Sequence, residues 1–125
     1  MNPPDERQRL SDYLAHILQA IERIARYTLD MTEEEFVGDE LTQDAVIRNL
    51  EVIGEASNSI QKHFPKFAAA HPELPLAFAY QMRNAVAHGY FRIDLEIVWK
   101  TIHGDLPSLA AQVAEQTALL DRLVP

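Results

Sequence analysis

The sequence predicts an all-α protein, a single domain over residues 1–125 built as an antiparallel bundle of four or five helices. Apolar residues recur at helical spacing along most of the chain, whereas the alternation typical of strands is hard to find. The connections between the helical segments are short, which favours antiparallel neighbours. The chain has no internal repeat, no low-complexity tract and no long linker.

The first helix is predicted over residues 5–29. Its apolar stripe consists of Leu10, Leu14, Ile17, Leu18, Ile21 and Ile24. Thr32 and Glu35 then form the spacing of a capping box, in which the two residues satisfy each other's backbone amides. This pattern predicts a short helix that Gly38 ends.

The second long helix is predicted over residues 42–63. Its buried side consists of Val46, Leu50, Ile53, Ser57 and Ile60. Gly54 lies inside this helix, where glycine costs ~1 kcal/mol relative to alanine, and so indicates a close approach of another helix. Pro65, Pro72 and Pro75 delimit the following connection, in which residues 67–70 form one helical turn.

The third main helix is predicted over residues 76–88, with Gly89 as the residue that ends it. Asp94 caps a fourth helix over residues 95–102, and Asp105 opens the last one. The last helix has a stripe of Leu109, Val113, Gln116, Leu120 and Leu123. Together these segments complete the predicted bundle.

Composition narrows the class of protein. The absence of cysteine excludes disulfides, thiolate zinc sites and thiol nucleophiles. The start of the chain lacks the pattern of a signal peptide, and no apolar run approaches the ~20 residues that cross a membrane. We therefore expect a soluble, cytoplasmic protein.

The charge is unevenly distributed. A net charge of −8 argues against a general nucleic-acid binder, whose affinity comes largely from neutralising phosphates. Residues 81–100 nevertheless carry three basic against two acidic residues, whereas the remainder carries 8 against 17. An RNA substrate stays possible, but it would be captured locally and not along a broad basic track.

The segment Met82–Phe91 contains the side chains that are the strongest candidates for a catalytic site. It contains Arg83, Asn84, His88 and Tyr90 within nine positions. A guanidinium binds phosphate through a planar fork of donors, and an imidazole transfers protons near neutral pH. These are the groups that a metal-free enzyme needs in order to cleave a phosphodiester.

The spacing within this segment leaves several arrangements open. Five residues place Arg83 and His88 roughly 140° apart on an ideal helix, whereas Asn84 and His88 share a face. The long Arg83 side chain can swing round, or Gly89 can release His88 from the helical path. The spacing favours a third arrangement, a cleft shared by two copies of the helix in a dimer.

A purely structural interpretation also exists. Arg83 would then pair with Glu55 or Asn49 of the preceding helix. His88 and Tyr90 would be helix-end residues that hydrogen-bond backbone carbonyls. Spacing alone favours this interpretation over a catalytic one.

Other candidate sites have weaker support. Arg9 and His16 also satisfy a loose arginine–histidine spacing, but they are interpreted as a solvated helix face. His63, His71 and His103 are isolated, and no pattern predicts a metal site. Glycine-rich phosphate loops are absent, which argues against binding of ATP by this chain alone. We expect no metal and no cofactor.

Several segments together resemble one family. These are residues 48–56 (RNLEVIGEA), 81–91 (QMRNAVAHGYF), 94–99 (DLEIVW) and 105–107 (DLP). They are similar to the HepT-type HEPN domains, formerly called DUF86. The resemblance covers nearly the whole chain and is specific, whereas the arginine–histidine spacing alone is not.

The resemblance implies an all-helical, HEPN-like homodimer whose paired motifs line a composite cleft. It implies a metal-independent endoribonuclease, the toxin of a toxin–antitoxin pair, with Arg83 and His88 as catalytic residues and Asn84 in support. The product would be a 2′,3′-cyclic phosphate, because the ribose 2′-OH acts as nucleophile. The antitoxin would be a minimal nucleotidyltransferase of the MntA type, which silences the toxin by attaching AMP to Tyr90.

Two rival functions remain at this point. The chain would be a non-catalytic helical partner that binds substrate or nucleotide for the nucleotidyltransferase, or a purely structural interaction protein. Loss of RNA cleavage in His88→Ala with retained RNA binding would separate the enzyme from the binding partner.

Overall fold

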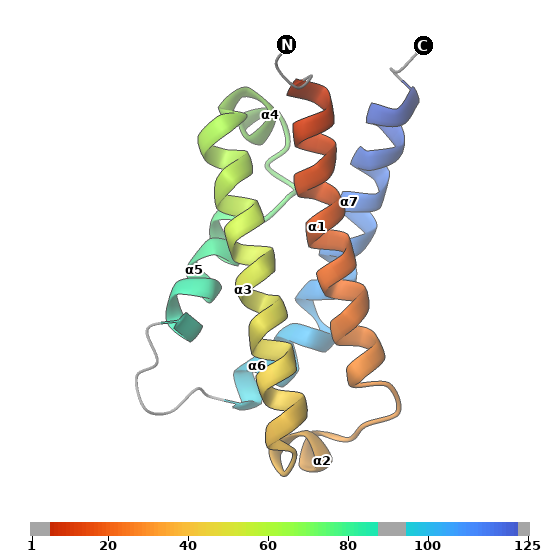
Figure 1. Ribbon diagram of the computed structural model, residues 1–125, viewed down its shortest axis with the longest axis vertical. Coiled ribbons are helices and arrows are strands. Elements are labelled where there is room, and N and C mark those ends of the chain that lie inside the picture. Colours follow the sequence, from red (N-terminus) through yellow and green to blue (C-terminus); the bar gives the residue numbers. More distant parts are fainter. Residues whose placement is uncertain (1–5, 88–94, 123–125) are drawn as a thin grey trace, which may run out of the picture.

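A computed structural model describes residues 6–87 and 95–122, without the side chains of Phe78 and residues 83–87. The described residues form helices and no strands (Figure 1). The helices are α1 (Glu6–Tyr27), α2 (Glu33–Val37), α3 (Glu40–His63), α4 (Pro65–Ala70), α5 (Leu76–Ala87), α6 (Leu95–His103) and α7 (Asp105–Arg122). The predicted all-α class is therefore confirmed.

The helices pack as a bundle in which α3 lies between α1 and α5. The long helix α1 runs antiparallel to both α3 and α7, and α7 also packs against α6 (Figure 1). Five helices have nine residues or more, as predicted, and α2 and α4 are short. The core contains the predicted stripes, including Leu14, Ile17, Ile24, Val46, Ile60 and Val113.

The short helix α2 begins and ends where the sequence predicts. The Glu35 backbone N–H donates to the Thr32 hydroxyl at 3.1 Å, and the Thr32 backbone N–H donates to the Glu35 carboxylate at 3.2 Å. This is the predicted capping box. Gly38 follows as the C-cap, and its N–H donates to the Glu34 carbonyl at 3.2 Å.

Two helix starts differ from the prediction. Helix α3 begins at Glu40 and not at residue 42, because Asp39 is its N-cap and accepts from the Thr42 N–H at 3.0 Å. Helix α4 begins at Pro65 and not at residue 67, since proline suits a first helical position. Asp105 opens α7 as predicted, directly after Gly104.

Some predictions lie outside the described residues. They include the end of the third helix at Gly89, the cap at Asp94 and the last stripe residue, Leu123. Within the described part of the chain, no helix combines the length and apolarity needed to cross a membrane.

Candidate functional site

Helix α5 carries the first half of the predicted site. Leu76 and Ala79 are buried, and Met82 is half-buried. Arg83 follows Ala79 by one turn and Leu76 by almost two, so its backbone position lies on the side of α5 that carries these buried residues. The sequence therefore places Arg83 near the end of a helix that is anchored to the bundle.

The described residues of α3, α5, α6 and α7 enclose a small apolar space. Leu50, Ile53, Met82, Thr101 and Leu106 line this space of 20 Å³, which holds about one water molecule and is too small for a nucleotide.

The neighbouring helix α3 contributes buried and exposed polar groups. Asn49 is buried, and its side-chain amide donates to the Ala45 carbonyl at 2.8 Å. Glu55 is exposed and lines a groove between α1 and α3. Gly54 is buried on α3, and α3 packs against α5. This position is compatible with the predicted close approach of another helix at Gly54, which stays a prediction.

The rest of the predicted site cannot be placed. His88 and Tyr90 lie outside the described residues, and the side chains of Arg83 and Asn84 do as well. The distance between the catalytic pair, the pairing of Arg83 with Glu55 or Asn49, and the shared cleft therefore all stay predictions.

The remaining described histidines lie at or just after the ends of different helices. His63 ends α3, His103 ends α6, and His71 follows α4 with its ring 2.8 Å from the Glu73 carboxylate. The Glu73 backbone N–H and, to a lesser degree, this contact lower the pKa of Glu73. No group of three or more potential metal-binding side chains occurs among the residues that the structure describes.

The structure brings together one set of polar residues that sequence reasoning did not connect. Tyr13 and His16 of α1 face Arg48 and Ser59 of α3 across a groove of 220 Å³. Arg48 also pairs weakly with Glu51, at 3.7 Å. His16 is exposed, as expected of a solvated face. Nothing local in the sequence links these residues, because helix packing alone makes them neighbours.

The family model and the similar proteins both indicate the same family for this chain. A family described as "Ribonuclease HepT-like" matches residues 17–115, a stretch that contains Arg83, Asn84, His88 and Tyr90. The chain is 45% identical over 98 residues to "Probable ribonuclease HepT" of Thermococcus cleftensis, covering 78% of this chain and 86% of the relative.

Two further relatives are more distant. "Putative RNase MJ0127" of Methanocaldococcus jannaschii and "Putative RNase TTE0752" of Caldanaerobacter subterraneus subsp. tengcongensis are each 36% identical over 103 residues. Both alignments cover 82% of this chain, and they cover 83% and 89% of the two relatives. No solved structure matches the chain at a significant level.

Proposed function

Because the chain belongs to the HepT-like ribonuclease family, we propose that it is a metal-independent endoribonuclease with Arg83 and His88 as its catalytic pair. The observation that carries the proposal is the family match over residues 17–115, which includes both residues. The position of Arg83 near the end of the anchored helix α5 is compatible with it.

The proposed reaction uses a nucleophile that RNA supplies. The ribose 2′-oxygen attacks phosphorus while the bond to the 5′-oxygen breaks, which leaves a 2′,3′-cyclic phosphate and a 5′-hydroxyl. His88 takes the proton from the 2′-OH or gives one to the leaving 5′-oxygen. Arg83 stabilises the negative charge that develops on the phosphorane.

The proposal includes a homodimer. Five residues separate Arg83 from His88, so one straight helix would point them in different directions. Two motif helices that meet across a dimer interface would bring an arginine of one subunit to a histidine of the other. Asn84, beside Arg83, would supply a further hydrogen bond to substrate.

The test is RNA cleavage by purified protein in the presence of EDTA. Arg83→Ala and His88→Ala should each lower the rate by about 10²-fold or more, because each removes a group that acts in the transition state. The matched controls are Arg9→Ala and His16→Ala, which alter the other arginine–histidine spacing of the chain and should leave the rate unchanged.

The same experiment separates the enzyme from the rival binding module. If the wild type binds labelled RNA but cuts none of it, the chain is a non-catalytic partner. If His88→Ala cuts as fast as the wild type, the nuclease site lies elsewhere. If EDTA stops the wild type, a metal ion takes part in the reaction.

We further propose that Tyr90 is the point of control in a toxin–antitoxin pair. A minimal nucleotidyltransferase would transfer AMP from ATP, so that the Tyr90 phenol oxygen bonds to the α-phosphorus and pyrophosphate leaves. The added phosphodiester would stand two residues from His88. Its bulk and negative charge would repel an RNA phosphate from the catalytic pair.

This control predicts a specific resistant variant. Tyr90→Phe should cut RNA at the wild-type rate but stay active after incubation with the nucleotidyltransferase, ATP and Mg²⁺. Tyr27→Phe, which alters an exposed tyrosine of α1, should be silenced like the wild type. Peptide mapping that found AMP on another residue, or silencing of Tyr90→Phe by catalysis, would contradict the assignment.

A further inference from the structure

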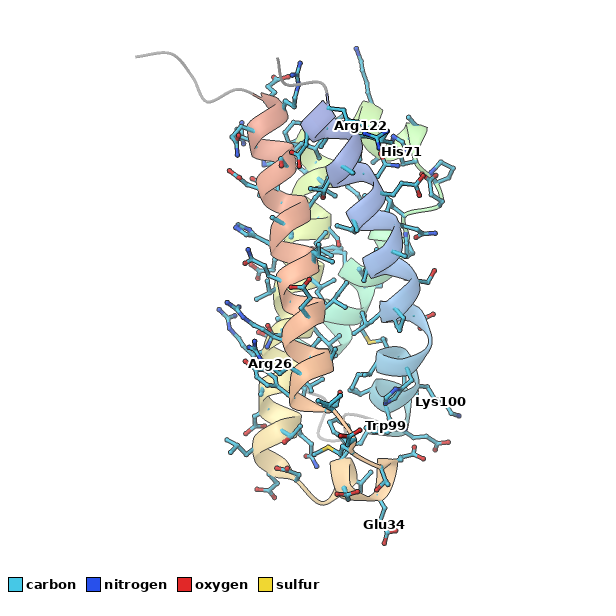
Figure 2. The ribbon with its side chains drawn as sticks, turned by 90° about the vertical axis from the view of Figure 1, so that its right-hand side faces the viewer. Arg26, Glu34, His71, Trp99, Lys100 and Arg122 are labelled. Carbon is cyan, nitrogen blue, oxygen red and sulfur yellow. The ribbon has the colours of Figure 1, made fainter. Side chains whose placement is uncertain are left out.

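An apolar groove lies on the side of the bundle away from α5, between α1 and the junction of α6 with α7. Its volume is 390 Å³. Ile24, Ile102 and Leu106, which are buried, form the floor of the groove. Ala25 of α1 and Leu29, two residues after α1 ends, line its exposed side. Figure 2 looks onto this side, with Arg26 on α1 and Trp99 and Lys100 on α6.

The end of the bundle at which the groove opens is both apolar and exposed. Leu29 at this end is 72% exposed and Leu41 is 81% exposed. Tyr27, Val37 and Ile97 are the other large apolar side chains that are exposed there. They come from the end of α1 and the residues after it, from α2, from the start of α3 and from α6. Helix α2 lies at the lower end of Figure 1 and packs against α3 and α6. Exposed apolar side chains gathered at one end of a molecule indicate an interaction surface.

The charge of this end is strongly negative. Glu22 and Asp30 line the groove itself. Residues 28–44 contain seven of the 19 acidic residues of the chain and no lysine, arginine or histidine. A ligand that covers the exposed apolar side chains must therefore bring positive charge with it.

We propose that this groove binds a positively charged amphipathic helix of a partner protein. The apolar face of such a helix would lie against Ala25, Pro107 and Ala110, which are accessible, and cover Leu29. Its lysine or arginine side chains would meet Glu22 and Asp30. Insertion of an amphipathic helix into an apolar groove is a common mode of protein recognition.

Charge argues against the other occupants. RNA and anionic lipid would be repelled by the carboxylates of residues 28–44. A second copy of the chain that presented the same end would bring fourteen carboxylates together, seven from each subunit. The inference is independent of the proposed nuclease activity, because it uses none of the residues from 83 to 90.

Trp99 provides a direct signal for the test. It is the only tryptophan of the chain, and its ring centroid lies 4.2 Å from that of His103, which lines the groove. The probes are two synthetic helical peptides of about 14 residues, four turns, with the same leucine face and either lysine or glutamate elsewhere. The lysine peptide should change Trp99 emission saturably, and the glutamate peptide should not.

Two variants test the location, each with a matched control. Leu29→Ser should weaken binding of the lysine peptide by about tenfold or more, because it removes an apolar contact without adding a charge. Leu119→Ser, which alters an exposed leucine of α7, should have no effect. Neutralising the rim with Glu22→Gln and Asp30→Asn should weaken binding by about threefold or more, whereas Glu115→Gln with Asp121→Asn should not. Asparagine suits position 30 because Asp30 has φ = 59°.

The outcomes decide the proposal. Equal binding of both peptides, or unchanged binding by Leu29→Ser with an unchanged far-ultraviolet circular dichroism spectrum, would overturn it. Ala25→Gln, which places a longer, uncharged side chain in the groove from an exposed helical position, is the second variant and should also weaken binding of the lysine peptide. Self-association that Leu29→Ser abolishes would assign the surface to a second copy instead.

Discussion

Single side chains decide where the helices of this bundle begin, and Asp39 shows it most clearly. Its carboxylate accepts from the Thr42 N–H at 3.0 Å and from the Thr42 hydroxyl at 2.8 Å. The backbone bond is the larger cause, and together these bonds lower the pKa of Asp39 below its usual 3.8. Protonation of Asp39 in the folded state therefore weakens the interactions that begin α3.

The lowered pKa of Asp39 predicts how acid affects stability. A group whose folded pKa is depressed contributes stability above its unfolded pKa and loses it as the pH falls through the folded value. Below pH 3.8 the advantage of the wild type over Asp39→Asn should therefore shrink, because asparagine caps without a charge. Urea unfolding of both proteins across the acid range measures this. An advantage that grows with falling pH would contradict the role given to Asp39.

At the scale of elements, Phe36 fixes the short helix α2 to the bundle. Its side chain is 0% exposed, and its ring centroid lies 5.5 Å from that of Trp99 on α6. A helix of five residues cannot be stable by itself, because helix nucleation is costly. The capping box and this aromatic anchor hold α2 in place, together with the Gln43 side-chain amide, which donates to the Phe36 and Val37 carbonyls at 2.9 and 2.8 Å.

Removal of the anchor should be costly. Phe36→Ala should lower the free energy of unfolding by about 3–5 kcal/mol, since it deletes a fully buried ring. The control is Leu41→Ala at the same end of the molecule, where the side chain is 81% exposed and the expected change is within about 0.5 kcal/mol. Urea unfolding curves measure both, and a loss below about 1 kcal/mol for Phe36→Ala would refute the anchor.

The elements also show what the sequence could predict. The capping box of Thr32 and Glu35 and the stop at Gly38 were predictable because their interactions are local. The start of α3 was not, because both Asp39 and Thr42 can cap a helix and the bond between them is visible only in the fold. The groove between His16 and Arg48 was missed for a similar reason, since it depends on the packing of α1 against α3.

For the whole molecule, charge differs between two groups of helices. Helix α3 lies between α1, which lines the apolar groove, and α5, which carries Arg83. Residues 28–44 around α2 contain seven acidic residues, whereas α5 contains Arg83 and no acidic residue. RNA approaching α5 would thus meet less negative charge than at α2.

The central claim is that Arg83 and His88 cleave RNA in a cleft shared by two subunits. The most direct test is RNA cleavage by a mixture of the Arg83→Ala and His88→Ala proteins, each of which should be inactive alone. In a mixed dimer one cleft regains both side chains, so cleavage should return, and sedimentation equilibrium should show twice the 14.2 kDa of one chain. The shared cleft would be contradicted if the two variants exchange subunits and the mixture is still as inactive as each variant alone. It would also be contradicted if only a 14.2 kDa species is present at micromolar concentration.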